Sequence, residues 1–298
     1  MPSGILMVRP AKAGFNDQTS PSNVFQGQAS GFELKDVLRE FELLARLLSE
    51  EGVEVHIQDA PADCPSPDAH FPNNWISFHP QALVLYPMES PLRRTEVNEA
   101  FVQKFLTENP GLNLLDLRSH TSRNFFLEGT GSLVFDYDKG FAYAALSSRT
   151  HEGLAGDVCR MLGFIPVTFS TNYKNLPVYH TNVLLSIGPS CAVLCDEIIP
   201  DSAERAKVKS FLERSGKEII TITSDEMAGF CGNVYFLTGN SGPLIAMSEK
   251  ARRSFRLANL KKIESYGTIV AADIPAIEAL GGGSVRCMIA EIRTENED

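Results

Sequence analysis

Hydrophobic and polar residues follow one another along the chain in a pattern that returns five times. In the clearest instance, Ser30 and Glu33 have capping-box spacing, and apolar residues between Leu34 and Leu48 recur at helical intervals on one face. Gly52 is suited to end this helix, and residues 53–57 then alternate in the manner of a strand. The pattern predicts a helix, a strand and then a polar loop.

Four further units of the same kind are predicted. Their helices begin near residues 95, 151, 201 and 248, and each leads to a strand, at residues 112–117, 164–168, 218–222 and 268–272. Another apolar stretch follows each loop, at residues 82–86, 132–135, 183–187 and 234–237. Each unit thus has the order β-(β)-α-β. This repetition favours a pseudo-symmetric α/β propeller, and an ordinary doubly wound α/β sheet is the alternative.

Residues with reactive or hydrogen-bonding side chains lie in the loops that follow the post-helix strands. They include a carboxylate pair, amides, a histidine and a thiol: Asp68, Asn74, Glu128, His180, Asn182, Asn233 and Cys287. Equivalent loops of a closed repeat emerge at the same end of its axis. We therefore expect these side chains to converge in one site, on a single domain that spans residues 1–298.

Composition and charge narrow the class of protein. The 298 residues are 43% hydrophobic and 21% charged, as in an ordinary globular protein, and the net charge of -10 disfavours nucleic acid as a partner. No apolar run approaches the roughly 18 residues of a membrane helix, and the first ten residues do not resemble a signal peptide. We expect a cytoplasmic protein that does not bind membranes, and the sequence leaves a homo-oligomer open.

Six cysteines are too few for a disulfide scaffold in a chain of this length. The question is therefore whether one of the thiols is a catalytic nucleophile. Cys287 follows three glycines and an arginine, an arrangement that suits a reactive thiolate beside a ligand. A small buried residue in a glycine-rich turn is the alternative. Of the other five, Cys231 lies beside a site loop, and the rest are expected to be structural: Cys64, Cys159, Cys191 and Cys195.

His180 and Glu128 are the partners that a cysteine nucleophile requires. Imidazole titrates in the range needed for a proton shuttle, and a carboxylate would orient it or bind substrate N–H groups. Taken alone, each residue could equally be structural. No spacing of metal ligands and no nucleotide-binding motif is present, so neither a metal nor a cofactor is expected.

Taken in order, these motifs resemble the pentein superfamily of guanidine-modifying enzymes, which includes arginine deiminases, dimethylarginine hydrolases and amidinotransferases. The resemblance spans the chain, from the loop at residues 68–74 through Glu128-Gly129 and the loop around Arg149 to the terminal Gly-Gly-Gly-Ser-Val-Arg-Cys287. It implies a five-bladed ββαβ propeller. By position it also implies that Cys287 is the nucleophile, His180 the general acid and base, Glu128 its partner and Arg149 a ligand of the substrate carboxylate.

Two departures from the deiminase pattern bear on the substrate. Asn74 and Asn182 stand where deiminases commonly have carboxylates, which would bind a cationic guanidinium. Amides offer a donor as well as an acceptor and fit a neutral ureido group. The pattern therefore looks like the citrulline-utilisation hydrolase branch, with citrulline converted to ornithine, ammonia and carbon dioxide, and with Asp68, Asn74, Asn182 and Asn233 in the substrate site.

Alternatives remain at this point. The substrate could be arginine, through deimination, dihydrolysis or amidino transfer, and the protein could also be a non-catalytic pentein that binds a small molecule. The polar stretch at residues 15–27 is either a lid over the site or plain surface.

Overall fold

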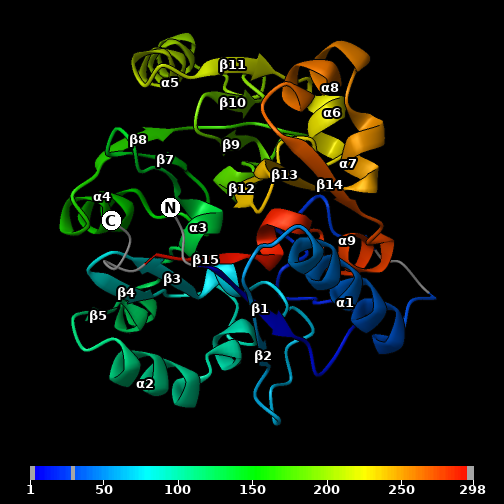
Figure 1. The fold of residues 1–298 in the computed structure, drawn as a ribbon. Coiled ribbons are helices and arrows are strands. Elements are labelled where there is room, and N and C mark those ends of the chain that lie inside the picture. Colours follow the sequence, from blue (N-terminus) through cyan, green and yellow to red (C-terminus); the bar gives the residue numbers. More distant parts are fainter. Residues whose placement is uncertain (1–3, 28–30, 294–298) are drawn as a thin grey trace.

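The computed structural model describes residues 4–27 and 31–293, which form five three-stranded sheets. In each sheet the inner strand pairs antiparallel with the middle strand, and the middle strand pairs parallel with the outer strand. A helical connection links middle and outer strands and lies at the rim (Figure 1). The predicted five-bladed ββαβ propeller is confirmed.

The strands follow one another blade by blade. They are β1 (Gly4–Arg9), β2 (Val55–Asp59), β3 (Ile76–His79), β4 (Ala82–Leu85), β5 (Asn113–Asp116), β6 (Val134–Asp136), β7 (Phe141–Ala145), β8 (Ile165–Phe169), β9 (Leu185–Ile187), β10 (Cys191–Leu194), β11 (Glu218–Thr221), β12 (Tyr235–Gly239), β13 (Gly242–Ser248), β14 (Thr268–Ala272) and β15 (Ala290–Ile292). The last strand, β15, pairs antiparallel with β1, so the two ends of the described chain close the ring within one sheet.

Helices of two kinds accompany the strands. The outer ones are α1 (Leu34–Glu50), α2 (Glu99–Glu108), α4 (Glu152–Met161), α5 (Ser202–Arg214), α7 (Glu249–Ser254) and α8 (Leu257–Glu264). The other helical segments are η1 (Pro72–Asn74), η2 (Arg93–Glu96), η3 (Arg118–Arg123), α3 (Gly129–Ser132), η4 (Thr181–Val183), α6 (Ser224–Ala228), α9 (Pro275–Gly281) and η5 (Val285–Met288).

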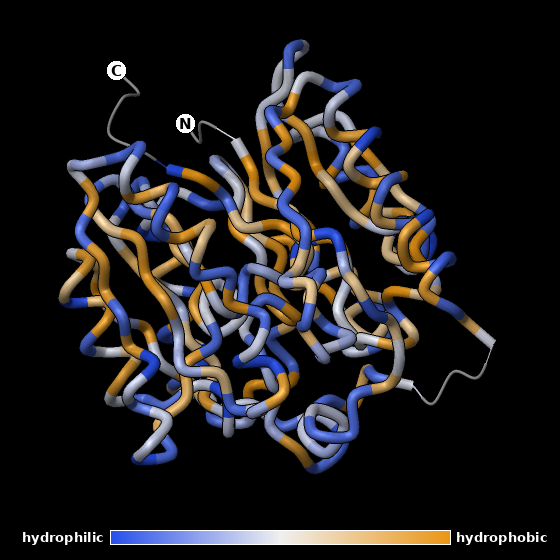
Figure 2. Tube along the Cα trace, turned by 90° about the horizontal axis from the view of Figure 1, so that it is seen from below, coloured by the Kyte–Doolittle hydropathy of each residue, from blue (hydrophilic) through white to orange (hydrophobic). Residues whose placement is uncertain are grey.

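The hydrophobic core lies between the outer helices and the blades. Helix α1, for example, buries the stripe that its sequence predicted, including Val37, Phe41, Leu44 and Leu48. Figure 2 shows hydrophobic and hydrophilic stretches alternating along the Cα trace. Inner strands of neighbouring blades pack on each other around the axis, β15 on β3 and β9 on both β6 and β12. No helix in the described part of the chain is long and apolar enough to cross a bilayer.

Several predicted boundaries were wrong, for identifiable reasons. Helix α1 is capped by Glu33 and Asp36, and Ser30 lies outside the described residues. The helix predicted from residue 95 begins at Glu99, because the Asn98 side chain caps it by accepting from Phe101 N. The helix predicted over 248–266 is broken into α7 and α8 at Phe255.

Candidate active site

Single turns of helix before the inner strands bring the predicted site residues together. Asn74 lies in η1 and Cys287 in η5, Glu128 and His180 are the residues just before α3 and η4, and Asn182 lies within η4. Asn233 comes from the equivalent turn of the fifth blade, where Phe230 adopts a left-handed conformation. Since these turns occupy the same end of neighbouring blades, residues up to 213 positions apart in sequence meet around the axis.

Cys287 is 3% exposed and is surrounded by amide groups. The Asn233 Nδ2 lies 3.4 Å from its Sγ and the Asn182 Nδ2 3.7 Å. Asn233 is fixed in turn, because its Nδ2 also donates to Asn182 O at 2.9 Å and its Oδ1 accepts from Arg286 N. Burial raises the pKa of the Cys287 thiol, and the two amides and the Arg286 charge oppose that rise.

His180 and Glu128 form a buried pair, with Nε2 and Oε2 2.8 Å apart. Burial lowers the pKa of His180 to about 4 despite the carboxylate beside it. Burial also opposes ionisation of Glu128, but Arg149, His180 and Arg93 outweigh it and bring the pKa of that carboxyl to about 2. At neutral pH the pair is therefore a carboxylate and a neutral imidazole.

Arg93 is a buried site residue that the sequence analysis missed. Its Nε and Nη2 donate to the two oxygens of Glu96 at 2.8 and 2.9 Å, and its Nη1 donates to Asn74 Oδ1 at 2.7 Å. It also lies 3.9 Å from Asp68 and from Glu128. The run Pro91-Leu92-Arg93-Arg94-Thr95-Glu96 resembles the solvated start of a helix, and only η2 turns Arg93 inward.

The amide of Asn74 has a defined orientation as a result. Because its Oδ1 accepts from Arg93, its Nδ2 is the group that remains to donate, and one N–H bonds to Asn73 Oδ1 at 3.0 Å. A Cβ added at Gly131 would lie 2.6 Å from Asn74 Nδ2 and 2.7 Å from His180 Nδ1. The two nitrogens thus approach each other across a position that only glycine can occupy.

Asp68 and Arg149 supply opposite charges to the site. Asp68 accepts from Asn16 at 2.7 Å through Oδ2, whereas its buried Oδ1 has no partner in the described structure. Burial raises the pKa of its carboxyl, against the pull of Arg93. The Arg149 guanidinium lies 3.6 Å from Glu128 and donates to Thr19 O and Ser22 Oγ, both at 2.8 Å.

Several of these residues enclose a small cavity. Its lining includes Thr19, Asn23, Asp68, Phe71, Asn74, Arg93, Arg149, Tyr179, His180, Gly281, Gly283 and Cys287. Thr19 and Asn23 belong to the stretch for which the sequence left lid and surface open, and both are buried against the site. That stretch therefore covers the cavity. Tyr179, also missed, donates from its hydroxyl to Gly282 O.

The other cysteines do not enter the cavity. Cys231, whose role the sequence left open beside a site loop, is not in the cavity lining and donates from Sγ to Ala251 O at 3.3 Å. All six cysteines are free thiols. Among the described residues, no cluster of histidine, cysteine and carboxylate side chains could hold a metal ion.

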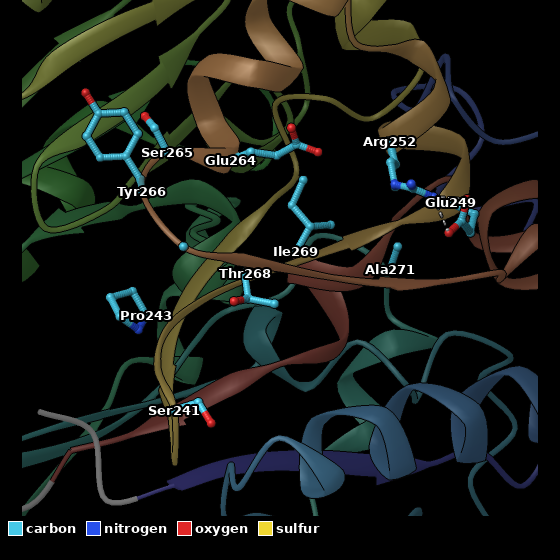
Figure 3. A pocket seen from close by; sticks show the side chains of 11 residues that line it. Ser241, Pro243, Glu249, Arg252, Glu264, Ser265, Tyr266, Thr268, Ile269 and Ala271 are labelled. Carbon is cyan, nitrogen blue, oxygen red and sulfur yellow. Dashed lines mark hydrogen bonds and ion pairs between the residues drawn. The ribbon is translucent and has the colours of Figure 1, made fainter.

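The open groove elsewhere on the protein lacks the reactive side chains of this cavity. Figure 3 shows the residues that line an open groove beside β13 and β14, where Arg252 pairs with Glu249 and Tyr266 stands at one side. Its lining contains neither a cysteine nor a histidine. The cavity around Cys287 is smaller, but of these two hollows it is the one lined by both a cysteine and a histidine.

Comparison with known protein families shows which family the chain belongs to. Residues 9–294 match the family model for N,N dimethylarginine dimethylhydrolase of the eukaryotic type. The chain belongs to that family. It is thus a pentein, in a family of hydrolases that act on C–N bonds of guanidino compounds. No curated protein matches the chain in sequence.

Solved structures have the same fold at low sequence identity. The N-terminal domain of ArgZ, a cyanobacterial arginine dihydrolase, in a cysteine-to-serine variant bound to substrate, aligns with a TM-score of 0.76 and 15% identity, over 97% of this chain and 98% of that one. The apo ArgZ structure gives a TM-score of 0.77 at 15% identity over 97% of this chain, which spans 40% of the ArgZ chain. A dimethylarginine dimethylaminohydrolase adduct with S-methyl-L-thiocitrulline gives 0.69 at 13% identity, over 98% and 100%.

Proposed function

We propose that this member of the family hydrolyses the ureido group of citrulline and belongs to the citrulline-utilisation hydrolase branch. The products would be ornithine, ammonia and carbon dioxide, and one water molecule is consumed. The observation that carries the proposal is the hydrogen bond from Arg93 Nη1 to Asn74 Oδ1 at 2.7 Å. It leaves Asn74 with a donor to offer to the substrate.

A donor at this position favours a neutral ureido group over a guanidinium. The ureido carbonyl oxygen accepts hydrogen bonds, whereas all three guanidinium nitrogens carry only N–H donors. A guanidinium beside Asn74 Nδ2 would place donor against donor, and a buried polar group without a partner is costly. The ureido N–H groups have an acceptor in Asp68 Oδ1, which is buried and has no partner in the described structure.

In this mechanism Cys287 attacks the ureido carbon. Its thiol gives its proton to His180, and the Asn182 and Asn233 amides that face Sγ stabilise the thiolate as it forms. The new S–C bond turns the carbonyl oxygen into an oxyanion, which Asn74 Nδ2 is oriented to receive. Glu128 stabilises the imidazolium through its 2.8 Å contact.

His180 then delivers its proton to the departing nitrogen, and the C–N bond breaks to leave a thiocarbamate on Cys287. A water molecule loses a proton to His180 and attacks this carbon, and the S–C bond breaks to regenerate the thiol. The second C–N bond is lost as the carbamate decomposes to amine and carbon dioxide. Arg149, which lines the cavity, is the proposed ligand of the α-carboxylate.

Arginine is the second candidate substrate, converted by dihydrolysis to ornithine. The buried carboxylates Asp68 and Glu128 favour a cation, and the ArgZ structures to which this fold is similar are of an arginine dihydrolase. Dimethylarginine is a further compound to test as a substrate, because the family is named for it.

The deciding experiment measures the release of ornithine, citrulline, ammonia and dimethylamine by the pure protein from citrulline, arginine and N,N-dimethylarginine. We expect the highest kcat/KM with citrulline and no turnover in Cys287→Ala. A higher kcat/KM with arginine would replace the citrulline proposal with dihydrolase activity. Turnover retained in Cys287→Ala would exclude the covalent mechanism, and a protein that binds these compounds without turnover would be a non-catalytic pentein.

A further inference from the structure

A second cavity lies on the propeller axis, behind the segment that carries the nucleophile. Residues of all five inner strands line it. Its polar lining includes Arg286, Arg293, Glu291, Tyr137, Tyr235 and Ser77. Cys287 lines the active-site cavity and Arg286 lines this one, so η5 separates the two.

Arg286 is a buried cation without a counter-ion in the described part of the chain. It is 6% exposed, its Nε has no hydrogen-bond partner, and no described carboxylate lies within the 4.0 Å of an ion pair. Its guanidinium packs on the Tyr235 ring, 5.0 Å from the centroid. A buried charge is costly unless it is paired, and the other buried arginines, Arg93 and Arg149, do have carboxylates nearby.

The rest of the cavity adds positive charge. Arg293 packs over the Tyr137 ring at 3.8 Å and is bonded through Nε and Nη2 to the two oxygens of Glu291, both at 2.9 Å. The lining therefore contains two guanidiniums, of Arg286 and Arg293, and one carboxylate, of Glu291. That carboxylate is already paired with Arg293. The lining has an excess of one positive charge, centred on Arg286.

We propose that this cavity binds a small oxyanion, a carboxylate or a phosphate, on the Arg286 guanidinium. The planar fork of arginine matches both groups, and Arg293 and the two tyrosines supply further donors around it. Two sources share this chemistry. One is a free anion, and the other is an acidic side chain of residues 294–298, since Glu295, Glu297 and Asp298 follow Arg293 in the sequence.

Occupancy of this cavity affects the neighbouring thiol. The positive charge of Arg286 is one of the influences that lower the pKa of Cys287. A bound anion offsets that charge, so the thiolate fraction falls and Cys287 reacts more slowly at a given pH. The site thus couples an anion to the reactivity of the nucleophile, whichever substrate the active site accepts.

The test uses inorganic phosphate as the probe, at constant ionic strength with sodium chloride as the reference. Binding is measured by calorimetry, and the rate at which iodoacetamide alkylates Cys287 is followed in parallel. For the wild-type protein we expect one phosphate per chain and a slower alkylation at saturation. Arg293→Gln and Arg286→Lys should weaken binding at least tenfold, whereas the exposed Arg46→Gln should bind as the wild type does.

A variant that ends at Arg293 separates the two sources. If phosphate binds this variant at least tenfold more tightly than the full chain, the occupant is the acidic C-terminal segment. Equal binding by both forms identifies a free anion. The proposal is overturned if neither form binds phosphate, or if Arg293→Gln and Arg286→Lys both bind it as tightly as the wild type. None of these outcomes depends on turnover, so they stand apart from the substrate question.

Discussion

At the scale of single residues, the proposed preference for citrulline depends on one amide. Asn74 faces the cavity with an N–H group because Arg93 occupies its oxygen. An aspartate there would accept from Arg93 and offer its second oxygen to the substrate, which is the pattern that a guanidinium requires.

Asn74→Asp is therefore expected to lower kcat/KM for citrulline and raise it for arginine, each on the order of tenfold. Steady-state kinetics with both substrates measures the ratio. Asn113→Asp is the control, since it adds the same charge at an exposed residue outside the cavity lining. A ratio that moves equally in both variants would contradict the role given to Asn74.

The protonation state of Cys287 gives a second residue-scale prediction. Burial disfavours the thiolate, so its apparent pKa should lie above the usual value of about 8.5, and alkylation by iodoacetamide should accelerate as the pH rises through that range. Asn233→Ala removes the donor at 3.4 Å and should move the profile to still higher pH. Mass spectrometry of the Cys287 peptide separates this thiol from the other five, and a profile centred below 8.5 would refute the prediction.

Which site residues the sequence could reveal depended on their neighbours along the chain. Cys287 follows three glycines, and His180 and Asn182 precede an apolar strand, so local pattern marked each of them. No local sequence pattern of this kind indicated Arg93. A basic residue ahead of an amphipathic helix is usually solvated, and its burial here results from contacts with Glu96 and Asn74, which the sequence does not place beside it.

At the scale of elements, the stretch at residues 15–27 is held over the cavity by hydrogen bonds. Asn16 bonds to Asp68, Thr19 and Ser22 accept from Arg149, and Asn23 donates to Gly281 O at 3.2 Å. The last contact lies beside Gly282, which ends α9 in a left-handed conformation (φ 62°). A Cβ at Gly282 would lie 2.6 Å from Asn23 Nδ2 and from Gln26 N.

Gly282→Ala is expected to displace this stretch and to reduce kcat/KM at least tenfold. Gly163→Ala is a close control, because Gly163 also has a positive φ, of 79°, but nothing lies within 4 Å of its added Cβ. Both variants should lose about 1 kcal/mol of stability from backbone strain. Thermal unfolding and kinetics on the two proteins separate strain from displacement, and equal activity losses would argue against a covering role.

The element boundaries show where local pattern and packing compete. Residues 248–266 have one continuous helical pattern, yet Phe255 leaves the helix to be buried, and Arg256 N donates to Glu226 Oε1 at 2.8 Å instead of to a helix carbonyl. Strands such as β7 and β13 went unpredicted, because strands buried on both faces show no alternation.

For the whole molecule, the repeat was the part that sequence could predict, because five copies of one pattern reinforce each other. The closure of the ring was not predictable in the same way. It depends on the pairing of β15 with β1, across nearly the full length of the chain. Contacts between blades are likewise invisible in the sequence, and His79 provides one of them.

His79 joins two neighbouring blades and makes the stability of the ring depend on pH. It is 2% exposed on β3, its Nε2 lies 2.8 Å from Ser77 Oγ, and its Nδ1 lies 3.2 Å from Tyr137 Oη, beyond β6. Burial, aided by Arg293, lowers the pKa of His79 to about 3. Between that value and the ordinary value of about 6.5, the unfolded chain binds a proton at this residue that the folded chain does not.

Stability linked to His79 is therefore retained at neutral pH and lost as the pH falls below about 6.5, by about 2 kcal/mol between pH 7 and pH 5. His79→Gln removes this linkage, so the difference in unfolding free energy between wild type and variant should shrink by that amount at pH 5. Urea unfolding at both pH values measures it. His56→Gln, at a half-exposed histidine, is the control and should leave the difference unchanged. An unaltered pH dependence in His79→Gln would show that His79 accepts its proton within the folded ring.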